Sequence, residues 1–313
     1  MASTSTQVSS TLLSIFASDI LPIFIVAGVG FLLARHSAVD ARILARIIFN
    51  SLSPALVFNL LVTSTVSAGE FGQMSLFCVL VTAAAGISAR IIAIPLRLDR
   101  ATLSAFLLVV MFSNSGNYGL PVAMFAFGRE ALARATVYFV TGSVMTYTVG
   151  VFLAASGRRA FGQAMLGVLQ VPAVYAIAAA GLVMALHVQL PLLVMRPVGM
   201  LSDAALPMMI LVLGMQLERA TMPERPAAVA AAVFASMVLT PLTAFGVASI
   251  LGMTGAAFQA AIVQASMPAA VVTTILALQY ETAPGFVTSV VFATTALSPV
   301  TLTVIIWLLR SQI

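Results

Sequence analysis

The stretch Ser113-Asn-Ser-Gly-Asn-Tyr-Gly-Leu-Pro121 interrupts a strongly apolar part of this chain. It follows Phe106-Leu-Leu-Val-Val-Met-Phe112 and precedes Val122-Ala-Met-Phe125, so a dense polar cluster stands in the middle of a hydrophobic run. Asn, Ser and Gly are poor helix formers, and Pro both lacks a backbone donor and clashes with the preceding turn. The stretch therefore predicts a broken helix within residues 101–127.

The composition around this stretch is typical of an integral membrane protein. Hydrophobic residues make up 61% of the chain and charged residues 7%, whereas about a quarter of the residues in a soluble domain are charged. No basic cluster with interleaved aromatic residues is present, which argues against a nucleic-acid partner. The composition predicts a protein that is embedded in the lipid bilayer and has almost no soluble domain.

Ten stretches are apolar and long enough to cross a bilayer, which takes roughly 20 residues. They are residues 17–34, 43–62, 70–89, 101–127, 134–154, 166–186, 199–217, 227–250, 256–279 and 284–309. The predicted fold class is thus an all-α membrane protein with ten transmembrane helices. Residues 1–16 are predicted to form a disordered N-terminal tail and not a cleaved signal peptide, because the Ser/Thr-rich start lacks a basic region.

The arginines predict the orientation in the membrane. The connections after the first, third, fifth and seventh spans carry ten of the fourteen basic residues, which are all arginine. Because short cytoplasmic loops are enriched in Lys and Arg, this asymmetry places both termini outside.

A faint internal repeat relates the two halves of the chain. Asn50-Ser-Leu-Ser-Pro54 in the second span matches Asp203-Ala-Ala-Leu-Pro207 in the seventh, and the same offset carries the fourth span into the ninth, which contains Gln264-Ala-Ser-Met-Pro268. Residues 17–157 and 158–313 would each hold five spans, and an odd number of spans gives the halves opposite orientations. This pattern predicts the inverted repeat of secondary transporters, with helices 4 and 9 broken and crossing each other.

A crossing of the two breaks would bring two half-helix N-termini together. Each carries a partial positive charge, so they could hold a carboxylate without any basic side chain. The candidate substrate-binding residues are Asn114, Ser115, Gly116, Asn117, Tyr118, Pro121, Ser53, Gln264, Ser266 and Pro268, and candidate lining residues are Asn50, Pro54, Tyr138 and Tyr147. The alternative is a proline-kinked helix whose polar groups pair with neighbours, and ordinary packing explains the two tyrosines equally well.

Asp203 is a candidate for proton coupling, because it lies inside the predicted seventh span. An ionised carboxylate is costly at membrane depth, so burial would favour its protonated form. The alternative is a hydrated Asp203 near the outer end of the span, where it would cap a helix.

At Asn114–Pro121 the chain resembles the auxin efflux carrier family, and Asn50–Pro54, Asp203–Pro207 and Gln264–Pro268 support this resemblance. The resemblance covers the whole chain and implies an elevator motion of helices 3–5 and 8–10 against a scaffold of helices 1, 2, 6 and 7. It also implies a homodimer in the bacterial cytoplasmic (inner) membrane, with mono- or dicarboxylates as substrates. Asn114, Asn117 and Pro121 match one crossover of the family and Pro268 matches the other, which here has no Asn.

The favoured function is therefore secondary transport of a small organic anion. A sodium-coupled symporter is the alternative within transport, and the coupling ion could be H⁺ or Na⁺, with no cofactor or metal site expected. A membrane sensor without flux is a second alternative. An enzyme is disfavoured, since the spans contain no HExxH motif and no Ser/His/Asp set, and no GxxxxGK loop indicates direct use of ATP.

Overall fold

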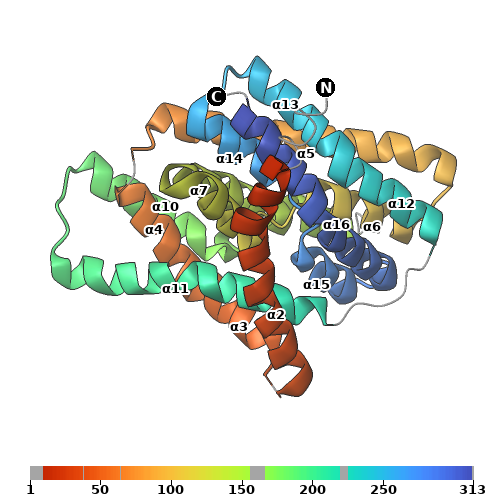
Figure 1. The fold of residues 1–313 in the computed structure, drawn as a ribbon, viewed down its shortest axis with the longest axis horizontal. Coiled ribbons are helices and arrows are strands. Elements are labelled where there is room, and N and C mark those ends of the chain that lie inside the picture. The colour runs from red at the N-terminus through yellow and green to blue at the C-terminus, as the bar shows by residue number, and fades with distance from the viewer. Residues whose placement is uncertain (1–9, 38, 64, 156–165, 219–224, 312–313) are drawn as a thin grey trace.

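The computed structural model describes residues 10–37, 39–63, 65–155, 166–218 and 225–311. Every regular element within these ranges is helical, and the only β pairing is an isolated bridge. Seven of the described helices are long and apolar enough to cross a membrane (Figure 1). They are Ser10–His36, Ala41–Thr63, Ala68–Leu96, Ser115–Ala154, Leu192–Leu217, Pro226–Ile250 and Pro284–Ser311.

The described residues contain seven long helices, whereas the sequence predicts ten spans. The difference arises because some predicted spans are shorter than a crossing, some are divided into two helices, and two are joined into one long helix. The predicted span 101–127 is divided into α6 (Arg100–Met111) and a helix that restarts at η3 (Ser115–Gly119). That helix continues as α7 (Leu120–Met145) through a kink at Gly128, whose φ of 77° is readily adopted only by glycine. The number of membrane crossings thus remains a prediction, while the multi-pass, all-helical character is established.

The sixth and ninth predicted spans are shorter than a full crossing. The sixth corresponds to α10 (Pro172–Ala185), which has 14 residues. The ninth is divided into α14 (Gly255–Ala265) and α15 (Val271–Gln279). The first helix is longer than predicted: it already begins at Ser10, so residues 10–16 of the predicted disordered tail are helical, whereas residues 1–9 lie outside the described ranges.

One group of helices packs around the long helix α11 (Leu192–Leu217), in the left and central part of Figure 1. It contains α2 (Leu21–His36), α4 (Ser53–Thr63) and α10. The backbones of α2 and α11 approach closely where Gly30 faces Leu211 and Gly214 faces Ala27, because a Cβ at either glycine would collide with the opposite carbonyl oxygen. Small residues of this kind allow membrane helices to pack at short distance.

A second group packs around α5 (Ala68–Leu96) and contains α6, α7, α14 and α15. The same group includes α12 (Pro226–Phe234), which continues through η6 (Ala235–Leu239) into α13 (Thr240–Ile250), and α16 (Pro284–Ser311). Phe106 of α6 stacks on Phe286 of α16 in its core, with ring centroids 6.3 Å apart. Much of this group occupies the right of Figure 1.

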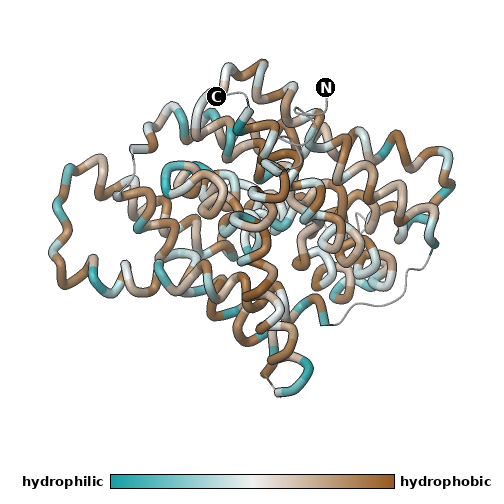
Figure 2. Tube along the Cα trace, in the orientation of Figure 1, coloured by the Kyte–Doolittle hydropathy of each residue, from teal (hydrophilic) through white to brown (hydrophobic). Residues whose placement is uncertain are grey.

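Hydrophobic residues predominate along the described helices, as the colours of the trace in Figure 2 show. Large hydrophobic side chains such as Ile25, Ile87, Leu193 and Ile250 are exposed on their outer surface. A continuous apolar exterior on long helices suits contact with lipid, where every backbone polar group must be paired within the protein.

Candidate functional site

The two interrupted segments pair with each other through their backbones. Ser113 and Ala269 form an antiparallel bridge. The amide of Asn114 donates to the carbonyl oxygen of Pro268 at 2.7 Å, and the amide of Ala270 donates to that of Phe112 at 2.9 Å. The pairing satisfies backbone groups that the helix breaks leave open, as a buried position requires.

The side chain of Gln264 locks this crossing against α7. It is fully buried, and its Nε2 donates to the carbonyl oxygen of Ala135 at 3.3 Å. Its Oε1 lies so close to Gly119 that a Cβ there would collide with it. Gln264 therefore fixes the position of one break relative to the other.

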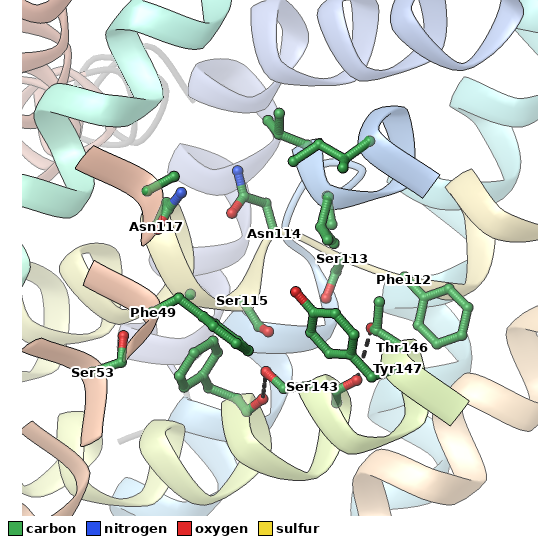
Figure 3. A pocket seen from close by; sticks show the side chains of 18 of the residues that line it. Phe49, Ser53, Phe112, Ser113, Asn114, Ser115, Asn117, Ser143, Thr146 and Tyr147 are labelled. Atoms are coloured by element: carbon green, nitrogen blue, oxygen red, sulfur yellow. Dashed lines mark hydrogen bonds between the residues drawn. The ribbon is translucent and has the colours of Figure 1, made fainter. Parts of the chain in front are cut away.

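A cavity of about 570 Å³ lies beside the crossing. Figure 3 shows Asn114, Ser115 and Asn117 gathered there with Phe49 and Tyr147. Of the residues that the sequence singles out, the cavity is lined by Ser53, Asn114, Ser115, Gly116, Asn117, Tyr138 and Tyr147. The others, Asn50, Pro54, Tyr118, Pro121, Asp203, Gln264, Ser266 and Pro268, do not line it.

Several of these other residues have structural contacts instead. The hydroxyl of the fully buried Tyr118 accepts a hydrogen bond from Ser298 Oγ at 3.1 Å. Ser266 Oγ donates to the carbonyl oxygen of Ile262 at 2.7 Å, as expected of a hydroxyl at a helix end. Asn50 is exposed, and its Nδ2 donates to the carbonyl oxygen of Arg46 at 2.8 Å.

Two helix N-termini contribute to the cavity wall. Gly116 and Asn117 belong to the first turn of the helix that starts at Ser115, and Val271 and Val272 to the first turn of α15. The first amides of a helix have no intrahelical acceptor and carry part of the positive end of its dipole. The wall formed by these turns therefore favours a negatively charged group.

Asn114 adds an unpaired donor at the same place. The residue is 6% exposed, and its Nδ2 has no hydrogen-bond partner within the described part of the chain. A buried donor without a partner costs about 1–3 kcal/mol. In the wall of the cavity this donor can bond to an acceptor that enters the cavity.

Two arginines complete the wall at its exposed end. Arg42 and Arg46 of α3 (Ala41–Ile47) both line the cavity and both are exposed. None of the described lining residues is Asp or Glu. The cavity thus combines amide donors and guanidinium groups without any acidic side chain, so its lining attracts anions.

Comparison with known protein families gives a match to the family described as membrane transport protein. The match extends over residues 15–306. The chain belongs to this family. This is the family of the auxin efflux carriers, so the resemblance predicted from residues 114–121 is confirmed.

Two archaeal relatives of this membrane transport protein are named as uncharacterized transporters. One, from Methanothermobacter thermautotrophicus, is 27% identical over 266 residues, which cover 84% of this chain and 87% of the relative. The other, from Methanocaldococcus jannaschii, is 27% identical over 288 residues, covering 86% and 90% of the two chains. The similarity spans almost the full length in both cases.

Arg42 and Arg46 of this transport protein are not among the predicted site residues. They lie near the end of a predicted span, where arginines in the sequence indicate only the orientation in the membrane. Arg42 and Arg46 add two cationic groups at the exposed end of the cavity to the predicted site, which contains no basic side chain. A signal was available: residues 42, 46, 49 and 53 are spaced so that they share one helix face, and all four line the cavity.

Among the described acidic residues of the transport protein, the buried one is Asp19 and not Asp203. Asp203 is exposed on α11 and does not line the cavity, and proton coupling through it stays a prediction. Asp19 is buried in the first helix and pairs with Arg310 of α16 at 2.8 Å. Asp19 lies close to the start of the predicted span 17–34, where hydropathy alone does not indicate a buried carboxylate.

Proposed function

We propose that this membrane transport protein is a secondary transporter of a small organic anion that carries a carboxylate. The observation that carries the proposal is the buried Nδ2 of Asn114, which has no hydrogen-bond partner among the described residues and lies in a cavity where two helix N-termini meet and the described lining contains no acidic side chain. A carboxylate accepts several hydrogen bonds at once, and bonds that involve an ionised group are the stronger ones. The side-chain amide of Asn114 and the backbone amides of the two helix N-termini supply donors for such a group.

The proposed architecture is two inverted repeats of five helices, residues 17–157 and 158–313, with helices 4 and 9 broken and crossing. The bridge between Ser113 and Ala269 supports it, because these residues belong to breaks at related positions in the two halves. Transporters of this design bind substrate where discontinuous helices meet near the bilayer midplane.

The proposed mechanism is an elevator-type alternating access. Helices 1, 2, 6 and 7 correspond to the group around α11 and would form the scaffold, while helices 3–5 and 8–10 would form the transport domain. The cavity lies between the two groups: Ser53 and Gln216 belong to the first, and Asn114 and Val271 to the second. A relative movement of the two groups would therefore change access to an anion held there.

The proposed location is the bacterial cytoplasmic membrane, with both termini outside and two copies assembled as a homodimer. The ion pair between Asp19 and Arg310 joins the first and last helices at one end of the molecule, which suits an even number of crossings. The cavity opens beside Arg42 and Arg46, on the side that the arginine asymmetry assigns to the cytoplasm.

Counterflow in proteoliposomes tests the proposal. Purified protein is reconstituted with an unlabelled carboxylate inside, and uptake of the labelled acid is followed with and without sodium and across pH. We expect exchange that is strongly reduced in Asn117→Ala, because this residue contributes a donor to the wall. Exchange that stops without sodium would favour the symporter, and absence of exchange for every acid in a broad panel would favour a sensor.

A further inference from the structure

The cavity has two electropositive regions at different depths. Ser53, Asn114 and Ser115 are buried and form the deep end, whereas Arg42 and Arg46 are exposed and form the mouth. The amide groups of the deep end suffice for one carboxylate. The guanidinium groups at the mouth are in excess of what that carboxylate needs.

The spacing along one helix face separates these regions. Arg46 and Ser53 are seven residues apart, with the π-helical turn η2 (Ile48–Leu52) between them, so they lie at different depths along the same helix. The side chain of an arginine is long and flexible, so the guanidinium group can approach a ligand that is anchored at the deep end. Arg42 lies one turn further out on the same face and can add to the charge at the mouth.

An apolar segment lies between the two regions. Phe49 packs against Tyr147 with ring centroids 5.3 Å apart and an interplanar angle of 43°, and both residues line the cavity (Figure 3). A ligand that reaches from the amides to the arginines would place a short carbon chain beside these rings. The order of groups is thus polar, apolar and cationic from the inside outward.

We propose that Arg46, assisted by Arg42, is a specificity-determining residue that binds a second carboxylate of the substrate, so that dicarboxylates are preferred over monocarboxylates. The inference rests on the proposed function, because it assumes a first carboxylate at the deep end. A guanidinium group can bind a carboxylate through two parallel hydrogen bonds. Such a contact discriminates between acids of similar length that differ only in the second charge.

The preference should be moderate and sensitive to salt, because both arginines are exposed to water. Exposed ion pairs are worth up to about 1 kcal/mol, which corresponds to about fivefold in affinity for each contact. Screening acts over about 10 Å at 0.1 M ionic strength. Added salt should therefore weaken the second contact more than the buried first one.

The test compares succinate with butyrate, which has the same number of carbons but one carboxylate. Binding to the purified full-length protein is measured from the dose dependence of thermal stabilisation at constant sodium concentration and at two ionic strengths. We expect succinate to bind about fivefold or more tightly than butyrate to the wild type. Arg46→Gln and the double variant Arg42→Gln/Arg46→Gln should remove this preference while leaving butyrate affinity within about twofold.

Arg35→Gln is the matched control, because Arg35 is exposed on α2 and does not line the cavity. Equal binding of the two acids to the wild type would overturn the inference while leaving the proposed function standing. The same holds if the arginine variants retain the succinate preference, or if Arg35→Gln removes it equally. Failure of both acids and of the wider carboxylate panel to bind would overturn the proposed function as well.

Discussion

The backbone amide of Asn114 donates to the carbonyl oxygen of Pro268 at 2.7 Å. This bond connects the polar break after α6 with the break after α14, which lie in different halves of the sequence. It also fixes the backbone of Asn114 while the side-chain Nδ2 stays without a partner. One residue thus serves both the crossing and the cavity wall.

Asn114→Asp should lower the affinity for anions more than Asn114→Ala does. Alanine removes one donor, whereas aspartate has nearly the shape of asparagine but adds an acceptor that repels a carboxylate. We expect affinity to fall by about tenfold to a hundredfold in the alanine variant, since a hydrogen bond to a charged group is worth about 1.5–3 kcal/mol, and further in the aspartate variant. Binding measured by thermal stabilisation checks the order, and equal affinity in all three proteins would remove Asn114 from the site.

Pro268→Ala should weaken anion binding, because it allows α14 to extend beyond its present end. Alanine supplies the missing amide and a free φ, so α14 can extend and shift the backbone that receives the bond from Asn114. We expect affinity to fall by about tenfold, equivalent to about 1.4 kcal/mol. Pro197→Ala is the control, because Pro197 is exposed on α11 and does not line the cavity. Unchanged affinity in Pro268→Ala would argue against a role for the crossing in binding.

Gly214→Ala should destabilise the fold. Its Cβ would collide with the carbonyl oxygen of Ala27, and backbone atoms cannot move aside as a flexible side chain can. Overpacking costs about 1–3 kcal/mol. Gly181→Ala is the matched control: nothing lies within 4 Å of its Cβ position in α10, so the change should stabilise by about 0.5–1 kcal/mol.

Thermal unfolding of these two variants can be followed with a thiol-reactive dye, because the chain has one cysteine and Cys78 is buried. The dye reacts when unfolding exposes the thiol. A melting temperature of Gly214→Ala at or above that of the wild type would show that α2 and α11 can separate at little cost.

Arg310→Gln should destabilise the protein more than Asp19→Asn. The side chain of Asp19 is 7% exposed and that of Arg310 is 38% exposed. Removal of the arginine leaves a buried carboxylate unpaired, whereas removal of the carboxylate leaves an arginine that water can reach. We expect losses of about 2–3 and about 1 kcal/mol in the free energy of unfolding. The reverse order in thermal unfolding would contradict this account.

Asp99 should make a pH-dependent contribution to stability. It caps α6 by accepting from the amide of Thr102 at 3.0 Å and pairs with Arg225 at 2.7 Å. The amide and hydroxyl of Thr102, and then Arg225, lower the pKa of Asp99 from 3.8 to about 2. Because the pKa is lower in the folded state, the stabilisation is fully present above pH 4 and is lost as the pH falls through 2.

Asp99→Ala should therefore cost about 1 kcal/mol at neutral pH, the usual value of an N-cap, and progressively less below pH 4. Asp99→Asn retains a capping acceptor and should cost less. The difference in melting temperature between variant and wild type, followed from pH 7 downward, measures this. A difference that stays constant with pH would mean that the carboxylate charge contributes nothing.

The sequence by itself determined the membrane character, the helical class and the family, and it predicted the breaks around Asn117 and Pro268. These properties depend on local composition: long apolar runs require a bilayer, and Gly, Asn and Pro interrupt a helix wherever they cluster. The same local reasoning placed Asp203 in the membrane and ignored Asp19, because hydropathy does not say which way a side chain points.

Only the tertiary structure decided which polar residues share the cavity. Helix rotation turned Arg42 and Arg46 toward the cavity and turned Gln264 toward Gly119 and Ala135. The pairing of Asn114 with Pro268 likewise joins residues that no sequence window contains together. The direction of a side chain is set by the packing of whole helices against each other, and that packing is a sum over contacts between distant segments.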